Sequence, residues 1–560
     1  MLRSIPHTPR AGTRDLPDVP PLLQYLILRF LPAILAWLET CILRQLLHRF
    51  ADHPLVQIAQ FYDLTPVIAA CADYYHAAEA PGKPPTFSIE LLVRAEIVRA
   101  WAESCSERDL EWHLSSNLLV RAFVGLPLLT PAPDHSTLNR FHAFLTDHHP
   151  DALFRDVLAF LERVDPEPGA TTPQIIDTFA LQSPAAWPPR TANLLLDLCA
   201  DLIRAWQHHA PSALQRVLPP LDLGPIFHPA RPRDALERQA LLSQAVSLSQ
   251  RLLTDLAPHL SVLPTKQRQP ISRLLEALAK VLADEIELDA TGQPSERTHK
   301  GDYRIISATD IDASFRKHDD DLTLGYNVAL ATTATRIRAV VVASGATPDN
   351  EAPILLAQQQ LSAQQPLPPY FVMDRAGGWG KCRGRLDVVS GGQTQMVALI
   401  PAAGGADPSR FGPADFVVDA ERTRCTCPNG VVSTKAYASG DGDGVHFRFL
   451  ASQCRNCPLW NDCRGAQGNP KGHRSVFVSD YHAYLRRAAA FNQSEEGQAL
   501  LSQRWRVEPT IAWLTRYTGC RRARRVGQTA AQFQLFQACA VRNLLLWLTR
   551  VRSGQAQRPA

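Results

Sequence analysis

The sequence lacks a long uncharged hydrophobic run. Its most apolar stretch, residues 22–38, is interrupted by Arg29 and Pro32 and is followed by Glu39. The uncharged part from Phe30 to Leu38 is too short to cross a bilayer, which takes about 20 residues. We therefore expect a buried helix here and no membrane association. A secretory signal is also lacking, which favours a cytoplasmic protein.

The chain has no Gly-x-x-x-x-Gly-Lys loop, the motif that cradles nucleotide phosphates, and no internal repeat of convincing period. The missing loop disfavours a hydrolase of small phosphate esters. Net charge is low as well, because 58 Lys and Arg against 54 Asp and Glu give +4 over 560 residues. With 45% hydrophobic residues, the chain can bury a large core, and its length predicts roughly two to four structural units.

Positive charge is concentrated towards the C-terminal end. From residue 471 onward there are 15 Lys and Arg against 4 Asp and Glu, a local excess of +11. Such a surface fits contact with a phosphate backbone, and a solvated basic face is the alternative. The densest cluster follows Gly519 and comprises Arg521, Arg522, Arg524 and Arg525.

Cysteine is unevenly spread, and five of the 12 lie between Cys425 and Cys463. In a chain without an export signal, this clustering favours metal over disulfides. Cys427, Cys454, Cys457 and Cys463 meet the spacing needs of a tetrahedral structural Zn²⁺ site, with Cys425 as a fifth candidate. Reduced thiols without metal are the alternative, because Cys427 and Cys463 form no second Cys-x-x-Cys pair.

Hydrophobic periodicity and composition divide the chain into segments. Helical spacing dominates 21–165, 191–285 and 480–551. Short β-rich runs and one helix lie between them, at Arg304–Ser307, Leu324–Thr332, Ile337–Ser344, Asn350–Leu361 (the helix), Tyr370–Met373 and Gln395–Ile400. We expect flexible ends at 1–20 and 552–560 and a helical N-terminal domain at 21–165. A mixed-sheet core should combine 170–190, 300–400 and 480–551. Within it we expect a helical insertion at 191–285 and a loop-like, cysteine-rich insertion at 401–470.

Three acidic residues stand in distinctive local settings. Asp177 lies in the apolar run Gln174-Ile-Ile-Asp-Thr-Phe-Ala180, Asp374 ends Tyr370-Phe-Val-Met-Asp374, and Glu508 precedes Pro509 at the predicted start of a late helix. A charge in so apolar a run is costly unless it is paired or bound to metal. Carboxylates at strand ends reach the rim of a sheet, where ligands bind in open α/β folds. Taken singly, each of the three is as well explained as a strand-end or helix-capping acid as it is as part of a functional site.

These features follow a definite order along the chain. A strand bearing one acid is followed by further strands, a helix, a strand that ends in a second acid and a late helix with a third acid. This is the order of a ribonuclease H-like α/β fold. Three convergent carboxylates can hold two divalent ions, which drive in-line attack at phosphodiesters.

The chain also resembles the bacterial insertion-sequence DDE transposases. The resemblance rests on motifs spread over most of the sequence: Phe87-Ser-Ile-Glu-Leu-Leu92, Cys105-Ser-Glu-Arg-Asp-Leu-Glu111, Asp134-His-Ser-Thr-Leu-Asn-Arg-Phe141, Ile176-Asp-Thr178, Ser307-Ala-Thr-Asp-Ile-Asp-Ala313, Leu324-Gly-Tyr326, Val372-Met-Asp374 and Arg504-x-x-Val507-Glu-Pro509. It implies that residues 87–147 form part of a helical N-terminal domain that binds DNA.

The resemblance implies a catalytic triad of Asp177, Asp374 and Glu508 with two Mg²⁺ or Mn²⁺ ions. The partners would be double-stranded DNA, as element ends and target, and a second copy of the chain. We also expect a nucleoid-associated enzyme, with Arg504, Arg516 and the cluster after Gly519 in contact with DNA. A catalytically decayed DNA-binding relative and a nuclease without strand transfer are the alternatives.

Some positions depart from the family pattern. Leu501 stands where a tyrosine is common before the third motif, and Thr515 where a lysine is common after it. Arg516 is adjacent, but one residue turns a helix by about 100°. In the N-terminal domain, a helix over Ser136–Leu145, with the helix over Glu107–Leu118, fits either a helix-turn-helix unit or a plain helical bundle.

Overall fold

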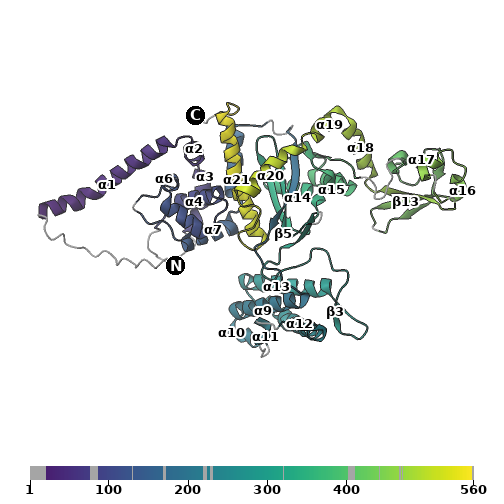
Figure 1. The fold of residues 1–560 in the computed structure, drawn as a ribbon, viewed down its shortest axis with the longest axis horizontal. Coiled ribbons are helices and arrows are strands. Elements are labelled where there is room, and N and C mark those ends of the chain that lie inside the picture. Colours follow the sequence, from purple (N-terminus) through teal and green to yellow (C-terminus); the bar gives the residue numbers. More distant parts are fainter. Residues whose placement is uncertain are drawn as a thin grey trace. The chain divides into compact units, whose positions relative to one another are not determined.

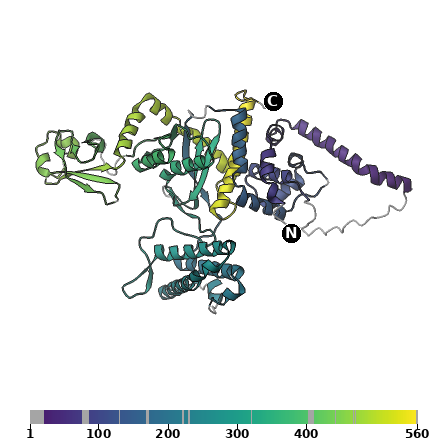
Figure 2. The same cartoon turned by 180° about the vertical axis from the view of Figure 1, so that it is seen from behind.

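The computed structural model describes residues 21–75, 86–128, 130–167, 172–218, 223–227, 231–318, 321–401, 410–440, 442–465, 468–469 and 471–557 (Figures 1 and 2). The predicted flexible segment 1–20 lies outside these residues, and 552–560 is described only as far as residue 557. Contacts divide the chain into two compact units. The first holds residues up to Val98 together with Glu107–His142, and the second holds Arg99–Ser106 and everything from Ala143 onward.

The first unit is helical, as expected. Its helices are α1 (Pro21–Arg49), α2 (Pro54–Phe61), α3 (Thr65–Ala70), α4 (Ile89–Trp101), α5 (Glu107–Ser116), α6 (Leu118–Val124) and α7 (His135–His148). The predicted helix over Phe30–Leu38 is present, but the prediction that it is buried is wrong. The exposed fraction is 51% for Phe30, 51% for Ile34 and 65% for Trp37. Among the described residues no single helix is long and apolar enough to cross a membrane, although the bent pair Pro54–Phe61 and Thr65–Tyr74 passes that test together.

Helices α5 and α7 are not joined by one short turn, because α6 lies between them in the chain. They are linked by side chains instead, since Glu111 Oε2 accepts hydrogen bonds from the backbone N–H of His135 at 2.9 Å and contacts its Nδ1 at 3.1 Å. Asp134 does cap α7, because its Oδ1 accepts from the Thr137 N–H at 2.7 Å. These contacts bring the first residue of α7 next to α5, although the two helices are not consecutive in the chain.

A mixed sheet forms the centre of the second unit (Figure 1). Its strands run in the order β4-β5-β1-β7-β8, and β6 also pairs with β5. The bounds are Gln174–Gln182 (β1), Ser314–His318 (β4), Asp321–Thr332 (β5), Ile337–Ser344 (β6), Tyr370–Val372 (β7) and Gln395–Val397 (β8). Strand β5 is antiparallel to β1, β4 and β6, whereas β1, β7 and β8 are parallel to one another.

Most of the predicted strands are confirmed. β5, β6 and β7 match the predictions closely, and β8 is shorter than predicted. The predicted strand at Arg304–Ser307 is wrong, since this segment is irregular. Its apolar residue Ile305 packs into the core of the helical insertion instead of joining a ladder.

Helices cover the sheet. Helix α14 (Ala352–Ser362) packs against β1, β5 and β6, α15 (Gly380–Ser390) packs against β8 and α14, and α21 (Gln528–Arg552) packs against β6 and α8 (Ala152–Val164). The buried residues between α14, α15 and the sheet include Ile176, Phe371 and Met373, which flank the two strand-borne acids. The acids are therefore held by backbone whose neighbours are fixed in a core.

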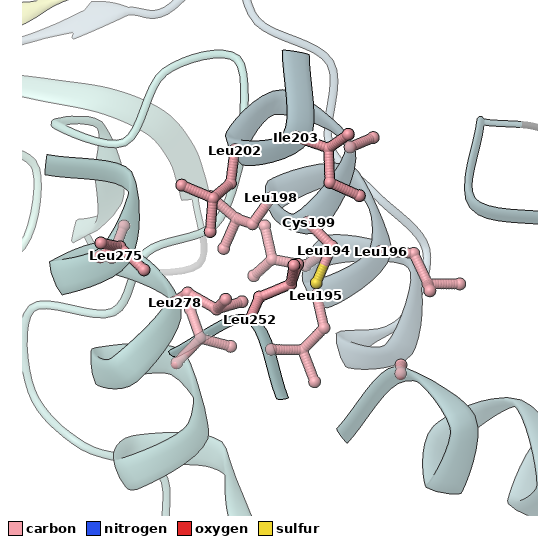
Figure 3. Close-up of a cluster of buried hydrophobic side chains, with 14 of the residues drawn as sticks. Leu194, Leu195, Leu196, Leu198, Cys199, Leu202, Ile203, Leu252, Leu275 and Leu278 are labelled. Atoms are coloured by element: carbon pink, nitrogen blue, oxygen red, sulfur yellow. The ribbon is translucent and has the colours of Figure 1, made fainter. Parts of the chain in front are cut away.

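The segment predicted as a helical insertion is mostly helical where the structure describes it. It contains α9 (Thr191–His209), α10 (Ser212–Gln215), α11 (Leu223–Phe227), α12 (Ala235–Leu256) and α13 (Thr265–Glu285), followed by the hairpin β2 (Ile286–Leu288) and β3 (Pro294–Glu296). Leucines of α9, α12 and α13 converge in one apolar core, in which Leu198, Leu252 and Leu278 have no exposed surface (Figure 3). This block therefore has its own core beside the sheet.

The segment predicted to be loop-like, 401–470, has regular structure where it is described. Its elements, with the strand that follows, are β9 (Val417–Val418), β10 (Cys425–Thr426), β11 (Val432–Ser433), β12 (Ala436–Ala438), β13 (Gly444–Phe449), α16 (Ala451–Cys454), α17 (Trp460–Arg464) and β14 (Arg474–Ser479). We call residues 410–479 the cysteine module. The chain then continues through α18 (His482–Gln493), α19 (Glu495–Leu501), the 3₁₀ turn η7 (Arg504–Val507), α20 (Glu508–Tyr517) and α21.

Candidate active site

Asp177 lies in the middle of β1, on the strand shared by the antiparallel and parallel halves of the sheet. It is opposite Leu330 of β5, and its side chain is half-buried. Its Oδ1 accepts a hydrogen bond from the Thr178 backbone N–H at 2.7 Å. The flanking residues Ile176 and Phe179 are buried, so the carboxylate is the polar exception in an apolar strand.

Asp374 lies two residues beyond the end of β7. The ladder continues past that end, because the Met373 N–H donates to the Val397 carbonyl at 3.0 Å. Asp374 then caps the 3₁₀ turn η5 (Arg375–Gly378), with its Oδ1 accepting from the Ala376 N–H at 2.9 Å. Its side chain is exposed, so the carboxylate emerges at the sheet edge as the sequence predicts.

The sheet brings these two aspartates together. Strands β1 and β7 are parallel, with Ile175 opposite Val372, and Asp177 and Asp374 each lie two positions further along. The pKa of Asp177 is raised to about 6, mainly by burial and also by the negative charges of Asp374 and Asp349, against the lowering effects of the Thr178 N–H and of Arg316. Two carboxylates held this close repel each other, and a bound cation would relieve that repulsion.

Sequence reasoning missed a polar group beside Asp177. Arg316 of β4 donates from Nη2 to Thr178 Oγ1 at 3.0 Å and to Asp349 Oδ1 at 3.3 Å. Asn327 of β5 also donates to Asp349 Oδ1, at 2.7 Å. Arg316 therefore ties the residue after Asp177 to a third nearby acid, and we regard it as a positioning residue. The signal available was Asp349, an acid five residues after the predicted strand Ile337–Ser344.

A cavity of about 430 Å³ opens beside this group. Its lining includes Asp349 and Asn327 together with three cationic side chains, Arg304, Arg316 and Lys317. Arg304 is already paired with Glu285 at 2.8 Å. The lining thus offers positive charge beside Asp349 and Arg316, in a space large enough for part of a nucleotide strand.

Glu508 is the first residue of α20, with Pro509 in the first turn as predicted. The turn η7 immediately before it packs against β1, and Val507 is buried whereas Glu508 is exposed. The chain therefore brings Glu508 next to the strand that carries Asp177. The charges that act on the pKa of Asp177 come from Asp374, Asp349 and Arg316, and not from Glu508.

No three carboxylate, thiol or imidazole groups of the described residues are close enough, as they stand, to hold a metal ion. Asp177 and Asp374 are neighbours, and the third carboxylate would have to turn towards them. As donors, three carboxylates suit Mg²⁺, which prefers oxygen ligands.

The arginines predicted to contact DNA differ in their surroundings. Arg516, Arg521, Arg522 and Arg524 are exposed, and Arg504 and Arg525 are half-buried. Arg524 also has a structural contact, donating from Nη2 to the Glu103 carbonyl at 2.9 Å.

The segment that carries the arginine cluster is anchored to the end of β1. The Gln182 N–H donates to the Arg521 carbonyl at 3.0 Å, and the Ala523 N–H donates to the Gln182 carbonyl at 2.8 Å. These bonds hold the cluster on the strand that carries Asp177.

The cysteines predicted as zinc ligands all lie in the cysteine module. Cys427, Cys454, Cys457 and Cys463 line one small cavity, and all are free thiols. Cys425 is buried in the module core instead, and it is not among the residues that line the cavity.

Comparison with known families gives two matches. Residues 426–546 match the model of a transposase DDE domain, and residues 44–143 match that of a transposase domain (DUF772). The two matches support an insertion-sequence DDE transposase. The DDE match contains Glu508 and the arginine cluster, whereas Asp177 and Asp374 lie before it. No curated protein and no solved structure matches the chain.

Proposed function

We propose that this transposase cleaves the ends of its element and joins them to target DNA at a single centre formed by Asp177, Asp374 and Glu508. The observation that supports the proposal is the parallel register of β1 and β7, in which Ile175 lies opposite Val372, two residues before Asp177 and Asp374 respectively. Glu508, at the start of the helix that follows the β1-packed turn η7, supplies the third carboxylate.

The proposal includes a ribonuclease H-like catalytic core. Strands β6, β5 and β1 form an antiparallel part of the sheet that supports it, β7 and β8 continue parallel to β1, and β4 adds a further antiparallel pairing with β5. The first acid lies on β1, the second follows β7, and a helix bears the third. Helices α14 and α15, which connect β6 to β7 and β7 to β8, make the parallel crossovers that such a sheet requires.

The three carboxylates would hold two Mg²⁺ or Mn²⁺ ions, which when bound supply an activated nucleophile and stabilise the leaving oxygen. Asp177 and Asp374 would bind the ions from the sheet, and Glu508 would bind them from α20. In the first step, water attacks the phosphodiester at the element end and releases a 3′-hydroxyl. In the second, that hydroxyl attacks a target phosphodiester and displaces the target's own 3′-oxygen, so one phosphodiester forms as another breaks.

Double-stranded DNA would be held by positive charge around this centre. Arg516, Arg521 and Arg522 are exposed on α20 and on the segment bonded to the end of β1. Arg504 and Arg525 flank them, and Arg524 adds charge while bonded to Glu103. We also propose a homodimer, because an element has two ends and each chain carries one set of the three acids.

The test is a nicking and joining assay on supercoiled DNA that carries the element ends. We expect Asp374→Asn to reduce strand cleavage by at least about 10³-fold, with DNA binding kept. Glu421→Gln, an exposed acid in the cysteine module, is the matched control and should cleave normally.

Three outcomes separate the possible functions. Unchanged cleavage by Asp374→Asn would remove this residue from the mechanism. Binding without Mg²⁺-dependent nicking by the wild type would indicate a decayed DNA-binding relative. Nicked DNA without joined products would indicate a nuclease that does not transfer strands.

A further inference from the structure

The cysteine module has a very small hydrophobic core. The buried residues of that core are Phe416, Cys425, Phe447, Phe449, Val476 and Val478. Most of its strands are two or three residues long, and only β13 and β14 form a longer ladder. Small folds with so little buried apolar surface usually need a further constraint such as disulfides or a structural metal. All 12 cysteines of the chain are free thiols, so no disulfide constrains the module.

Four cysteines from three separate pieces of the module meet around one cavity. Cys427 comes from the turn after β10, Cys454 ends α16, Cys457 follows it, and Cys463 lies in α17. All four line the same cavity, whose volume is about 30 Å³. A space of that size holds one water molecule or one ion, but no organic ligand. The remaining lining is largely apolar, with Phe411, Phe416 and Trp460 among it.

Tight turns fix the backbone at these cysteines. The Gly430 N–H donates to the Cys427 carbonyl at 2.8 Å, and the Cys427 N–H donates to the Val431 carbonyl at 2.9 Å. This turn needs glycine, because Gly430 has φ +79°. On the other side, the Cys457 N–H donates to the Cys454 carbonyl at 3.1 Å. Both turns are closed by backbone hydrogen bonds, so the cysteine positions are set before any ligand binds.

We propose that Cys427, Cys454, Cys457 and Cys463 bind one structural Zn²⁺ ion that holds the cysteine module together. Four thiolates give a closed tetrahedral set without an open position, so the ion would have no direct part in DNA cleavage. The Sγ atoms must move to about 2.3 Å from the ion, which is closer than the described residues place them. The nearby cations Arg464 and Arg474 would offset the negative charge of the complex.

Cys425 provides a matched control. It is only two residues from Cys427, but its side chain has no exposed surface and lies in the module core rather than at the cavity. Substitution of a cysteine that acts only by packing, such as Cys425, should leave zinc bound, whereas substitution of a ligand should not.

The test is the zinc content of the full-length protein, purified under reducing conditions without chelator and measured by plasma mass spectrometry. We expect one Zn²⁺ per chain in the wild type and in Cys425→Ser, and a large loss of zinc in Cys454→Ser and Cys457→Ser. Substitution by Co²⁺ should give thiolate-to-metal charge-transfer absorption in the wild type and in Cys425→Ser. These measurements do not use DNA, so they stand or fall independently of the proposed catalytic centre.

Wild-type protein that contains no zinc and takes none up when it is added would overturn the proposal. Zinc retained by both Cys454→Ser and Cys457→Ser would overturn it as well, as would a disulfide found among the four cysteines in freshly prepared protein. If a serine variant is insoluble, its zinc measurement is replaced by limited proteolysis of the wild type, with and without a strong chelator. Faster cleavage within residues 410–479 after chelation supports the ion, and unchanged cleavage contradicts it.

Discussion

Asp177 is a single residue whose ionised form is unfavourable in the folded chain. Its pKa is raised from 3.8 to about 6, first by burial and then by the charges of Asp374 and Asp349. A raised pKa in the folded state means that the folded protein binds the proton more tightly than the unfolded chain does. The ionised carboxylate therefore destabilises the fold above about pH 6, and this effect disappears as the pH falls towards 4.

Asp177→Asn should stabilise the protein when no divalent ion is added. The gain should be about 1–3 kcal/mol at pH 8, and it should shrink steadily between pH 6 and pH 4. Added Mg²⁺ should raise the unfolding temperature of the wild type but not of the variant, because the variant lacks a ligand. The measurement is thermal unfolding at several pH values with and without Mg²⁺. An equal Mg²⁺ effect on both proteins would count against Asp177 as a ligand.

For single residues, the sequence indicates which acids are candidates for the site but not which side chains contact them. Asp177 and Asp374 are recognisable because each follows or interrupts an apolar run. Arg316 and Asp349 are not, because their roles depend on contacts with Thr178 and with each other across 138 and 33 residues. Periodicity carries no information on such pairs.

Among the elements, the start of α21 is fixed to the sheet by one buried acid. Asp310 accepts hydrogen bonds from Ser183 Oγ after β1 at 2.6 Å, from the Tyr326 hydroxyl of β5 at 2.7 and 2.6 Å, and from the Gly527 N–H at 3.2 Å. The adjacent Gly325 has φ +154°, and a Cβ there would lie 2.1 Å from the Leu181 carbonyl oxygen. The Leu324-Gly-Tyr326 motif is thus explained by packing.

Tyr326→Phe should destabilise the second unit by about 1.5–3 kcal/mol, because a buried carboxylate loses a hydrogen-bond donor. Tyr437→Phe is the matched control, since Tyr437 is 47% exposed, and its unfolding should be unchanged. Urea unfolding followed by fluorescence measures both. Equal midpoints for Tyr326→Phe and the wild type would show that Asp310 does not depend on this bond.

Element prediction succeeded where apolar runs are long and failed where they are short or charged. β5 and β6 are long, largely buried strands, and both were predicted. β4 was missed, because Ser-Phe-Arg-Lys-His has little apolar content and becomes a strand only by pairing with the first part of β5. The strands of the cysteine module were missed because a ladder of two residues has no period to detect.

For the whole molecule, the central question is whether one chain or two act on an element. Each chain supplies one proposed set of Asp177, Asp374 and Glu508, and each set opens one strand at a time. An element has two ends that must enter the same target site. A pair of chains that engages both ends before joining would couple the two reactions, whereas single chains would join each end separately.

Mixing wild-type protein with Asp374→Asn at constant total concentration distinguishes these cases. With equal amounts and random pairing, only about a quarter of the pairs hold two active centres, so two-ended joining should fall to about a quarter of the wild-type level. Mixing with Glu421→Gln should cause no loss. The measurement is the yield of two-ended products over a series of mixing ratios. With the amount of wild-type protein held constant and DNA in excess, added Asp374→Asn that leaves the two-ended yield unchanged would argue against paired action, because each chain would then contribute on its own.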